Sequence, residues 1–167
     1  NPNDMCLTRD GRWNSVAKNT DNNVLVADTR QLKVVESLHS ALYPNAPVGS
    51  TTNSVALSED EKMLFIANAD NNCMAVFDVS QPGTSKSLGF IPTGWYPTCV
   101  RVTGNKLLVA NGKGIASMAN PYGPNPVRRG SEVVHHEGGR EIRTKVQYIA
   151  GLLRGTLNLL KIPKMKS

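Results

Sequence analysis

The stretch Asn53-Ser-Val-Ala-Leu-Ser-Glu-Asp-Glu-Lys-Met-Leu-Phe-Ile-Ala-Asn68 decides the fold, because the chain contains its pattern more than once. Residues 3–17 match it at an offset of 50, and both copies continue into an Asp-Asn-Asn turn, with one residue expected to be gained or lost on each side. Residues 98–103 and 107–111 match its first half, with a turn two residues shorter. Such internal repetition is typical of solenoids and propellers.

The second copy shows what one unit contains. We predict strands over 54–58, 63–67, 73–79 and 87–91, because each is a short, β-prone run between polar or Pro/Gly-containing turns. Four strands joined by short turns form an antiparallel meander, and the 41 residues from Thr52 to Pro92 suit one propeller blade. The sequence therefore predicts an all-β fold made of four-stranded β-propeller blades.

The strand count predicts a partial ring of about three blades. We expect blades over 1–51 and 52–96, and an incomplete blade over 97–167 whose third strand is Thr156–Ile162. Rings close with about four to eight blades, and open sheet edges pair or aggregate. We therefore expect a fragment of a longer polypeptide that is poorly stable alone, with assembly from several copies as the alternative.

Charge is unevenly distributed along the chain. Residues 1–100 carry seven basic and ten acidic side chains, whereas residues 101–167 carry twelve and three. A basic half of this kind is either a solvated tail or a contact surface for nucleic acid, an anionic surface or an acidic protein. Nucleic acid is disfavoured because no base-reading motif accompanies the Lys and Arg residues.

The remaining global features point to no chemistry. Cys6, Cys73 and Cys99 lack the spacing of a zinc site or a disulfide framework and lie in apolar runs, so we expect buried thiols. No apolar run is long enough to span a membrane, and the first residues do not resemble a signal peptide. The sequence predicts no catalytic residue, no metal site and no cofactor.

The repeat resembles a known family. The pattern Asn-x-Val-Ala-Leu-Ser-x-Asp-x-Lys-x-Leu-Phe-Ile-Ala-Asn, with Ile66-Ala-Asn68 and Val109-Ala-Asn111, is similar to the YVTN-repeat β-propellers, also called lactonase-like or surface-layer-type propellers. The first copy departs from that pattern at Ser15-Val-Ala-Lys18. Residues 89–97, 109–114 and 148–156 are similar to bacterial propellers followed by an alkaline-phosphatase-superfamily phosphoesterase domain. The resemblance implies a periplasmic or secreted protein whose metal site lies downstream.

A basic insertion at 112–147 interrupts the third unit, where a turn of two or three residues is expected. Long loops in compact domains are usually functional or disordered, so we predict the main partner-binding element here. The adjacent histidines lack the spacing of a chelating pair, and Gly112-Lys-Gly114 lacks P-loop spacing and is predicted to be a strand-exit turn. The candidate residues in this segment are Lys113, Arg128, Arg129, His135 and His136.

Trp95, Tyr96 and Asn111 complete the candidate site. The two aromatics stand between consecutive units, where they either line a pocket on the loop face of the propeller or seal two blades together. Asp70-Asn-Asn72 is better explained by a hairpin turn than by calcium binding. On the inner strands, Asp4, Ser54 and Thr98 are predicted to occupy equivalent places, and they do not form a convincing metal set.

Two functions follow from these features. The first is a non-catalytic scaffold or interaction module, joined to further blades and a downstream domain, whose basic insertion contacts an acidic protein partner. The alternative is the propeller part of a phosphoesterase or lactonase-type hydrolase whose catalytic site lies mostly outside residues 1–167.

Overall fold

The computed structural model describes residues 1–115, 123, 132–146 and 153–163. Within these ranges every regular element is a β-strand, and no helix that could cross a membrane is found there. The strands are β1 (Pro2–Leu7), β2 (Trp13–Lys18), β3 (Asn23–Asp28), β4 (Lys33–His39), β5 (Thr52–Leu57), β6 (Met63–Asn68), β7 (Cys73–Asp78), β8 (Lys86–Pro92), β9 (Trp95–Thr103), β10 (Lys106–Gly114), β11 (Glu132–Glu137), β12 (Arg140–Lys145) and β13 (Thr156–Lys161).

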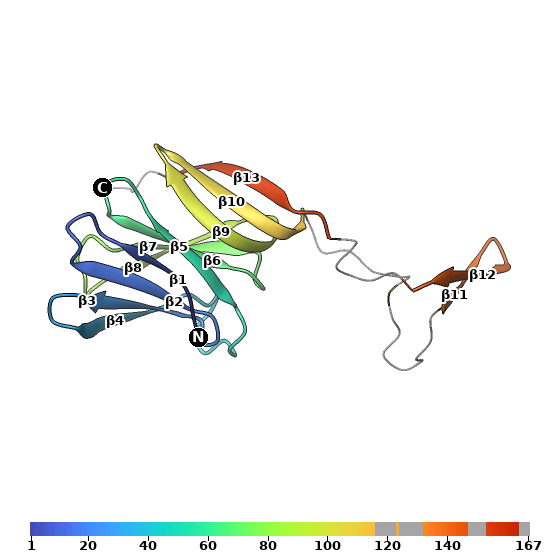
Figure 1. The fold of residues 1–167 in the computed structure, drawn as a ribbon, viewed down its shortest axis with the longest axis horizontal. Coiled ribbons are helices and arrows are strands. Elements are labelled where there is room, and N and C mark those ends of the chain that lie inside the picture. Colours follow the sequence, from blue (N-terminus) through green and yellow to red (C-terminus); the bar gives the residue numbers. More distant parts are fainter. Residues whose placement is uncertain (116–122, 124–131, 147–152, 164–167) are drawn as a thin grey trace.

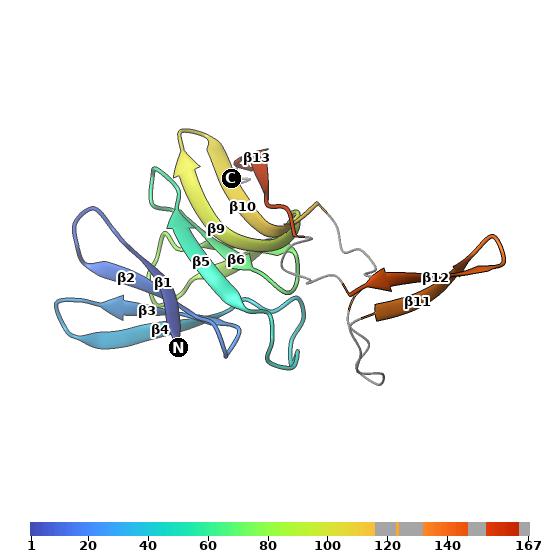
Figure 2. The ribbon, with the colours of Figure 1, turned by 45° about the vertical axis from the view of Figure 1, so that its right-hand side comes forward.

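The strands form three blades and one separate hairpin. β1 to β4 and β5 to β8 are four-stranded antiparallel meanders in chain order, and β9, β10 and β13 form a three-stranded sheet in the order β13-β10-β9. Figures 1 and 2 show the three sheets side by side, with β1, β5 and β9 as neighbouring inner strands. The predicted fold class, a partial ring of propeller blades, is confirmed.

Two apolar cores hold the blades together. Side chains alternate between the two faces of a strand, so the middle blade supplies both cores, and all six residues of β6 are buried. Full burial of a large aliphatic side chain stabilises the fold by about 1.5–3 kcal/mol. The first core contains Ala17, Val24, Val26, Leu38, Val55, Leu64, Ile66, Ala75 and Phe77. The second contains Ala56, Met63, Phe65, Ala67, Met74, Val76, Val100, Leu107 and Val109.

The first two blades superimpose in register without interruption from β1 to β3. The turns after β2 and β6 are closed by the pairs Lys18↔Asn23 and Asn68↔Cys73, so they have the same length. Asn22 and Asn72 both have a positive φ, of 53° and 52°, and are therefore equivalent. The predicted gain or loss of a residue around this turn is wrong, because the αL position of the turn fixes Asn22 against Asn72 at the offset of 50.

The β1–β2 and β5–β6 turns share a bond between a hydroxyl and a carboxylate. The Oγ atoms of Thr8 and Ser58 donate to Oδ1 of Asp10 and Asp60, each at 2.6 Å. Each carboxylate also accepts a backbone N–H two residues further on. These bonds hold the pKa of Asp10 and Asp60 below the ordinary value, and the bond from the hydroxyl is the larger cause. The Ser/Thr-x-Asp signature of the repeat is therefore a turn device.

The insertion is more ordered than predicted at two places. β10 continues to Gly114, so Gly112-Lys-Gly114 is strand and not the predicted strand-exit turn. Within 112–147, where a loop was predicted, β11 and β12 pair as an antiparallel hairpin around Gly138 and Gly139 (orange in Figure 1). Both glycines have a positive φ, of 57° and 78°, as a two-residue hairpin turn of type I′ requires.

Candidate functional site

Four of the predicted site residues meet at one end of the third blade. β9 begins where β10 ends, and the ladder pairs Trp95 with Gly114 and Asn111 with Pro97. Lys113 and Tyr96 are thereby brought to the same corner. We call Trp95, Tyr96, Asn111 and Lys113 the aromatic corner.

Lys113 lies against both rings of the aromatic corner. Its Nζ is 3.9 Å from the centroid of the Tyr96 ring and 5.8 Å from that of the Trp95 ring. All three side chains are half-buried. A cation over an aromatic face is stabilised by about 0.5–1 kcal/mol at an exposed site, and by more where water is displaced. The ammonium is therefore positioned by the rings on a partly exposed surface.

Asn111 is the buried anchor of the corner. It is 2% exposed, and its Nδ2 donates to Thr156 Oγ1 at 3.2 Å and to Asn158 Oδ1 at 2.8 Å. Asn158 Oδ1 also accepts the backbone N–H of Gly94 at 2.8 Å. A Cβ at Gly94 would stand 2.6 Å from Asn111 Nδ2, so the close approach requires glycine. Oδ1 of Asn111 is buried and has no hydrogen-bond partner among the residues that the structure describes.

An asparagine of the preceding blade holds Tyr96 in place. Tyr96 has a φ of 65°, which is unusual for a bulky residue, and its N–H donates to Asn72 Oδ1 at 2.8 Å. One blade earlier, the N–H of Ser50 donates to Asn22 Oδ1 at 2.7 Å, and Thr51 has a φ of 52°. The positive φ therefore recurs at the joint between blades. Asn72 belongs to the predicted hairpin turn, and its amide oxygen accepts the Tyr96 N–H.

The other predicted site residues are not brought to this corner. Arg128 and Arg129 lie outside the described residues. His135 pairs in register with Ile142 of β12, and His136 is exposed opposite Glu141. Whether these residues bind a partner stays a prediction.

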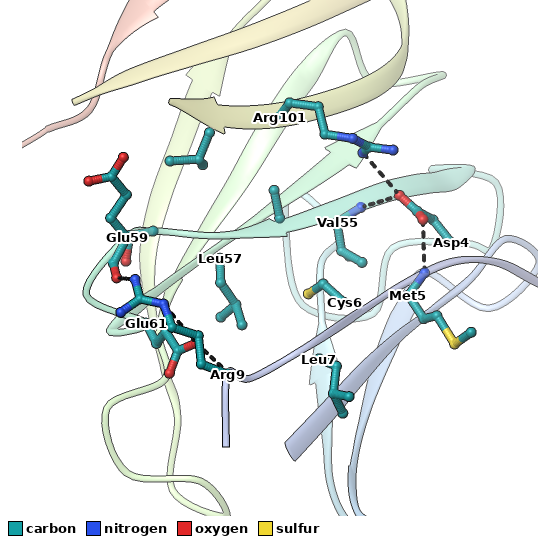
Figure 3. Close-up of a pocket in the computed structure, with 13 residues that line it drawn as sticks. Asp4, Met5, Cys6, Leu7, Arg9, Val55, Leu57, Glu59, Glu61 and Arg101 are labelled. Atoms are coloured by element: carbon teal, nitrogen blue, oxygen red, sulfur yellow. Dashed lines mark hydrogen bonds and ion pairs between the residues drawn. The ribbon is translucent and has the colours of Figure 1, made fainter. Parts of the chain in front are cut away.

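A second concave region lies along the inner strands, and we call it the inner-strand pocket (Figure 3). It has a volume of about 460 Å³. Asp4 lies at one end, where its Oδ2 accepts Ser54 Oγ at 2.6 Å and the Val55 N–H at 3.2 Å. Arg101 of the third blade is 3.7 Å from the same carboxylate. One carboxylate thus contacts all three blades.

Turn residues form the other end of the inner-strand pocket. Glu61 Oε1 accepts the Arg9 N–H at 2.7 Å, and the Arg9 guanidinium donates to the carbonyl of Glu59. The Glu59 carboxylate in turn accepts the N–H of Gly104 in the third blade. Figure 3 shows apolar side chains, among them Leu57, between the two polar ends. Both ends of the pocket are therefore occupied by contacts between blades.

The inner-strand equivalents differ from the prediction. Asp4, Ser54 and Cys99 face Ala17, Ala67 and Ala110 in their ladders, so the third equivalent is Cys99. The prediction that Thr98 is equivalent to Asp4 and Ser54 is wrong. The same bulge occurs in all three blades and leaves Asn3, Asn53 and Thr98 without a register partner, so Thr98 is equivalent to the two asparagines.

Cys6 and Cys73 have a raised pKa, so both thiols stay protonated. Burial raises the pKa of Cys6 to about 12 and that of Cys73 to about 11. Cys73 is buried as predicted, whereas Cys6 and Cys99 are half-buried. A thiol that stays protonated is a poor nucleophile. No cluster of three His, Cys, Asp or Glu side chains suited to a metal ion was found in the described part of the chain.

Comparisons with known proteins agree on the fold. A candidate 6-phosphogluconolactonase of Bacteroides uniformis is 20% identical, with a TM-score of 0.57 over 96% of this chain and 40% of its own. A candidate 6-phosphogluconolactonase of Bacteroides fragilis is 18% identical, with a TM-score of 0.57 over 96% of this chain and 42% of its own. The Cps50 (Swd1) β-propeller domain of Myceliophteria thermophila is 13% identical, with a TM-score of 0.50 over 98% of this chain and 44% of its own.

These likenesses show the fold alone, because the identities are low. The chain spans less than half the length of each of these three structures. No protein-family model matches the sequence, and no curated protein matches it. The chain is thus a set of β-propeller blades whose structural neighbours include lactonase-like propellers.

Proposed function

We propose that this chain is a non-catalytic segment of a larger β-propeller, which packs between further blades and presents a partner-binding surface at its loop ends. The observation that carries the proposal is the pair of apolar sheet faces at the two ends of the row of blades. On the first blade, Met5 is 67% and Leu7 54% exposed. On the third, Leu157 is 63% and Leu159 59% exposed.

The middle blade shows how such faces are normally covered. β6 lies between two sheets, and every residue of it is buried. The outer blades alternate instead: in β13 the half-buried residues face the second core, and the exposed leucines face away from it. Contiguous apolar surface of this kind marks an interaction site. Another blade is the partner whose shape and chemistry match, because blades already pack on both sides of the middle one.

The finer features of the proposal come from the sequence. Similarity to YVTN-repeat propellers, and to those followed by a phosphoesterase domain, supports a polypeptide in which further blades and a downstream domain contact this segment. The same similarity supports a periplasmic or secreted location. The basic half of the chain supports an acidic protein partner.

Oxidative footprinting tests the covered faces. The full polypeptide and the isolated 167-residue chain are exposed to hydroxyl radicals, and oxidation of each methionine is measured by mass spectrometry. We expect Met5 to be protected in the full polypeptide and reactive in the isolated chain at a concentration too low for self-association, while Met63, which is 8% exposed, is protected in both. Equal reactivity of Met5 in both proteins contradicts the proposal.

The non-catalytic part of the proposal has its own test. The candidate 6-phosphogluconolactonases among the structural neighbours make lactone hydrolysis the reaction to assay. We expect the chain to hydrolyse a sugar lactone no faster than buffer does, because Asp4 and Arg101 in the inner-strand pocket are engaged with each other and with the neighbouring strand. Turnover that Asp4→Asn abolishes contradicts this part.

A further inference from the structure

The third blade departs from the repeat at the aromatic corner. Thr52↔Asn68 and Pro97↔Asn111 are equivalent ladder pairs in the second and third blades. They set Trp95 and Tyr96 at the positions of Ser50 and Thr51, whereas Lys113 lies in the register shift between Asn111 and Gly114, which has no counterpart in β6 because that strand ends at Asn68. The backbone is shared at this joint, because Thr51 and Tyr96 both have a positive φ. The departure therefore concerns the side chains at Trp95 and Tyr96 and the continuation of β10 beyond Asn111.

The two sets of side chains differ in charge and in shape. In the second blade the Thr51 hydroxyl donates to the Asp70 carboxylate, so the corner is small and anionic. In the third blade an ammonium lies over two rings, so the corner is aromatic and cationic. The positive φ occurs with threonine as well as with tyrosine, so this backbone conformation does not require an aromatic residue.

We propose that the aromatic corner binds a side-chain carboxylate of an acidic protein segment, with an apolar residue of that segment packed on Trp95 and Tyr96. This rests on the partner-binding part of the proposed function. Within the described residues no carboxylate forms an ion pair with Lys113, while the rings hold its ammonium at a partly exposed surface. An ammonium held in this way is available to an incoming anion.

Charge complementarity favours an acidic segment. Residues 101–167, which include Asn111 and Lys113 of the corner, carry twelve basic and three acidic side chains. Opposite charge on a partner speeds association and selects among partners. Peptide is favoured over nucleic acid because the corner presents one cation beside two rings, whereas a nucleic-acid backbone is bound by a run of cations.

Nuclear magnetic resonance tests the proposal on the 167-residue chain that carries Met5→Lys and Leu159→Lys, two substitutions at exposed positions that are expected to keep it monomeric. The probe is a short glutamate-rich peptide that contains phenylalanine, and the readouts are the two tryptophan indole N–H signals. Trp95 reports on the corner, and Trp13 is an internal control, because Arg12 lies 4.5 Å from its ring centroid in the first blade. We expect a saturable shift of the Trp95 signal only, and weaker binding as salt is added.

Variants of one residue make the test specific. Lys113→Met keeps the stem of the side chain and removes its charge, so we expect binding about tenfold weaker, while Lys113→Arg retains it. Lys106→Met, at the other end of β10, is the matched control and should bind as the parent does. Equal binding by Lys113→Met, or equal shifts of both tryptophans, overturns the proposal.

Two further outcomes are decisive. A single-stranded oligothymidylate that binds at Trp95 as tightly as the peptide, with the same dependence on Lys113, overturns the assignment to an acidic protein segment. Absence of any shift with the peptide also overturns it. Neither result affects the packing of further blades on Met5 and Leu157, which the footprinting experiment tests separately.

Discussion

Asparagine side chains join consecutive blades at the level of single residues. Asn72 accepts the N–H of Tyr96, and Asn22 accepts those of Gly49 and Ser50, so each amide carbonyl fixes the start of the next inner strand. Asn111 acts within its own blade and donates to β13. The same residue type is thus used for two kinds of connection, and both depend on tight approach of the backbone.

Substitution of Gly94 tests how closely the backbone packs against Asn111. A Cβ at Gly94 would lie 2.6 Å from Asn111 Nδ2 and 2.8 Å from the Gly114 carbonyl oxygen. We expect Gly94→Ala to lower the free energy of unfolding by about 1–3 kcal/mol, because backbone atoms cannot move aside cheaply. Urea denaturation measures the change.

Gly104→Ala is the control for Gly94→Ala. Gly104 has a φ of 56° with no atom within 4 Å of an added Cβ, so its substitution costs backbone strain alone, about 1 kcal/mol. If Gly94→Ala destabilises the protein no more than Gly104→Ala, the close packing of the corner is contradicted.

Asp60 links the turn device to pH. Its pKa is lowered chiefly by the Ser58 hydroxyl, so the carboxylate stabilises the fold above the pKa of the unfolded chain. This contribution is lost as the pH falls through the lower pKa of the folded state, in the acid range below the ordinary 3.8. We expect Ser58→Ala to reduce the loss of stability between about pH 6 and about pH 2.

Urea denaturation at several pH values measures this effect. Ser80→Ala is unsuited as a control because its hydroxyl lowers the pKa of Asp78 in the same way. Ser87→Ala, in the exposed part of β8, should leave the acid dependence unchanged. An identical acid dependence for Ser58→Ala and the parent contradicts the assigned role.

At the scale of elements, one carboxylate fastens the outer strand of the first blade to the second. Glu36 of β4 accepts the N–H of Gly83 at 3.0 Å, and the N–H and Oγ of Ser85, each at 2.7 Å. All of its partners are donors, so the amide nitrogen of glutamine would face a donor. We expect Glu36→Gln to lower the free energy of unfolding by about 1–2 kcal/mol in chemical denaturation.

Asp21→Asn serves as the control for Glu36→Gln. Asp21 forms an exposed ion pair with Lys18 within one turn, and an exposed pair of this kind contributes little to stability. A Glu36→Gln variant as stable as Asp21→Asn shows that the Glu36 contact does not fasten the blades.

The elements were predictable where turn chemistry and alternation agree. The strands β5 to β8 lie within one or two residues of the predicted ranges, because each apolar run is bounded by polar or Pro/Gly turns. The hairpin of β11 and β12 was missed, although Gly138-Gly139 between Val134 and Ile142 is a hairpin signal. The surrounding Pro- and Gly-rich sequence obscured it.

The candidate site was predictable only in part. Trp95, Tyr96, Asn111 and Lys113 were identified singly, and the structure brings them together through the β9–β10 ladder. The cation over two rings could not be predicted, because it depends on β10 continuing to Gly114. Similarly, the contact of Asp4 with Arg101 joins the first and third blades and has no signal in local sequence.

At the scale of the whole molecule, the two open faces govern behaviour in solution. Met5 and Leu159 lie on opposite ends of the row of blades and are 67% and 59% exposed. We expect the isolated chain to self-associate, and the double variant Met5→Lys/Leu159→Lys to be monomeric at the same concentration. Analytical ultracentrifugation measures the distribution of species.

The free energy of unfolding shows whether the double variant is monomeric because its faces are changed or because it is unfolded. The two side chains are largely exposed, so the double variant should change the free energy of unfolding by no more than about 0.5 kcal/mol. Val24→Lys is the contrasting variant, because Val24 is fully buried and its substitution should destabilise the first core. Persistent association of the double variant contradicts a role for these faces.

The unbroken offset of 50 between residues 2–28 and 52–78 has a genetic consequence. Recombination between the two copies at any matched codon in this range would delete one unit in frame. The product would be one hybrid sheet. Its first three strands would combine residues of both units, its turn would keep the αL asparagine, and its last strand would be that of the second unit. The number of blades could therefore change in a single recombination event, because the existing connection between blades is kept.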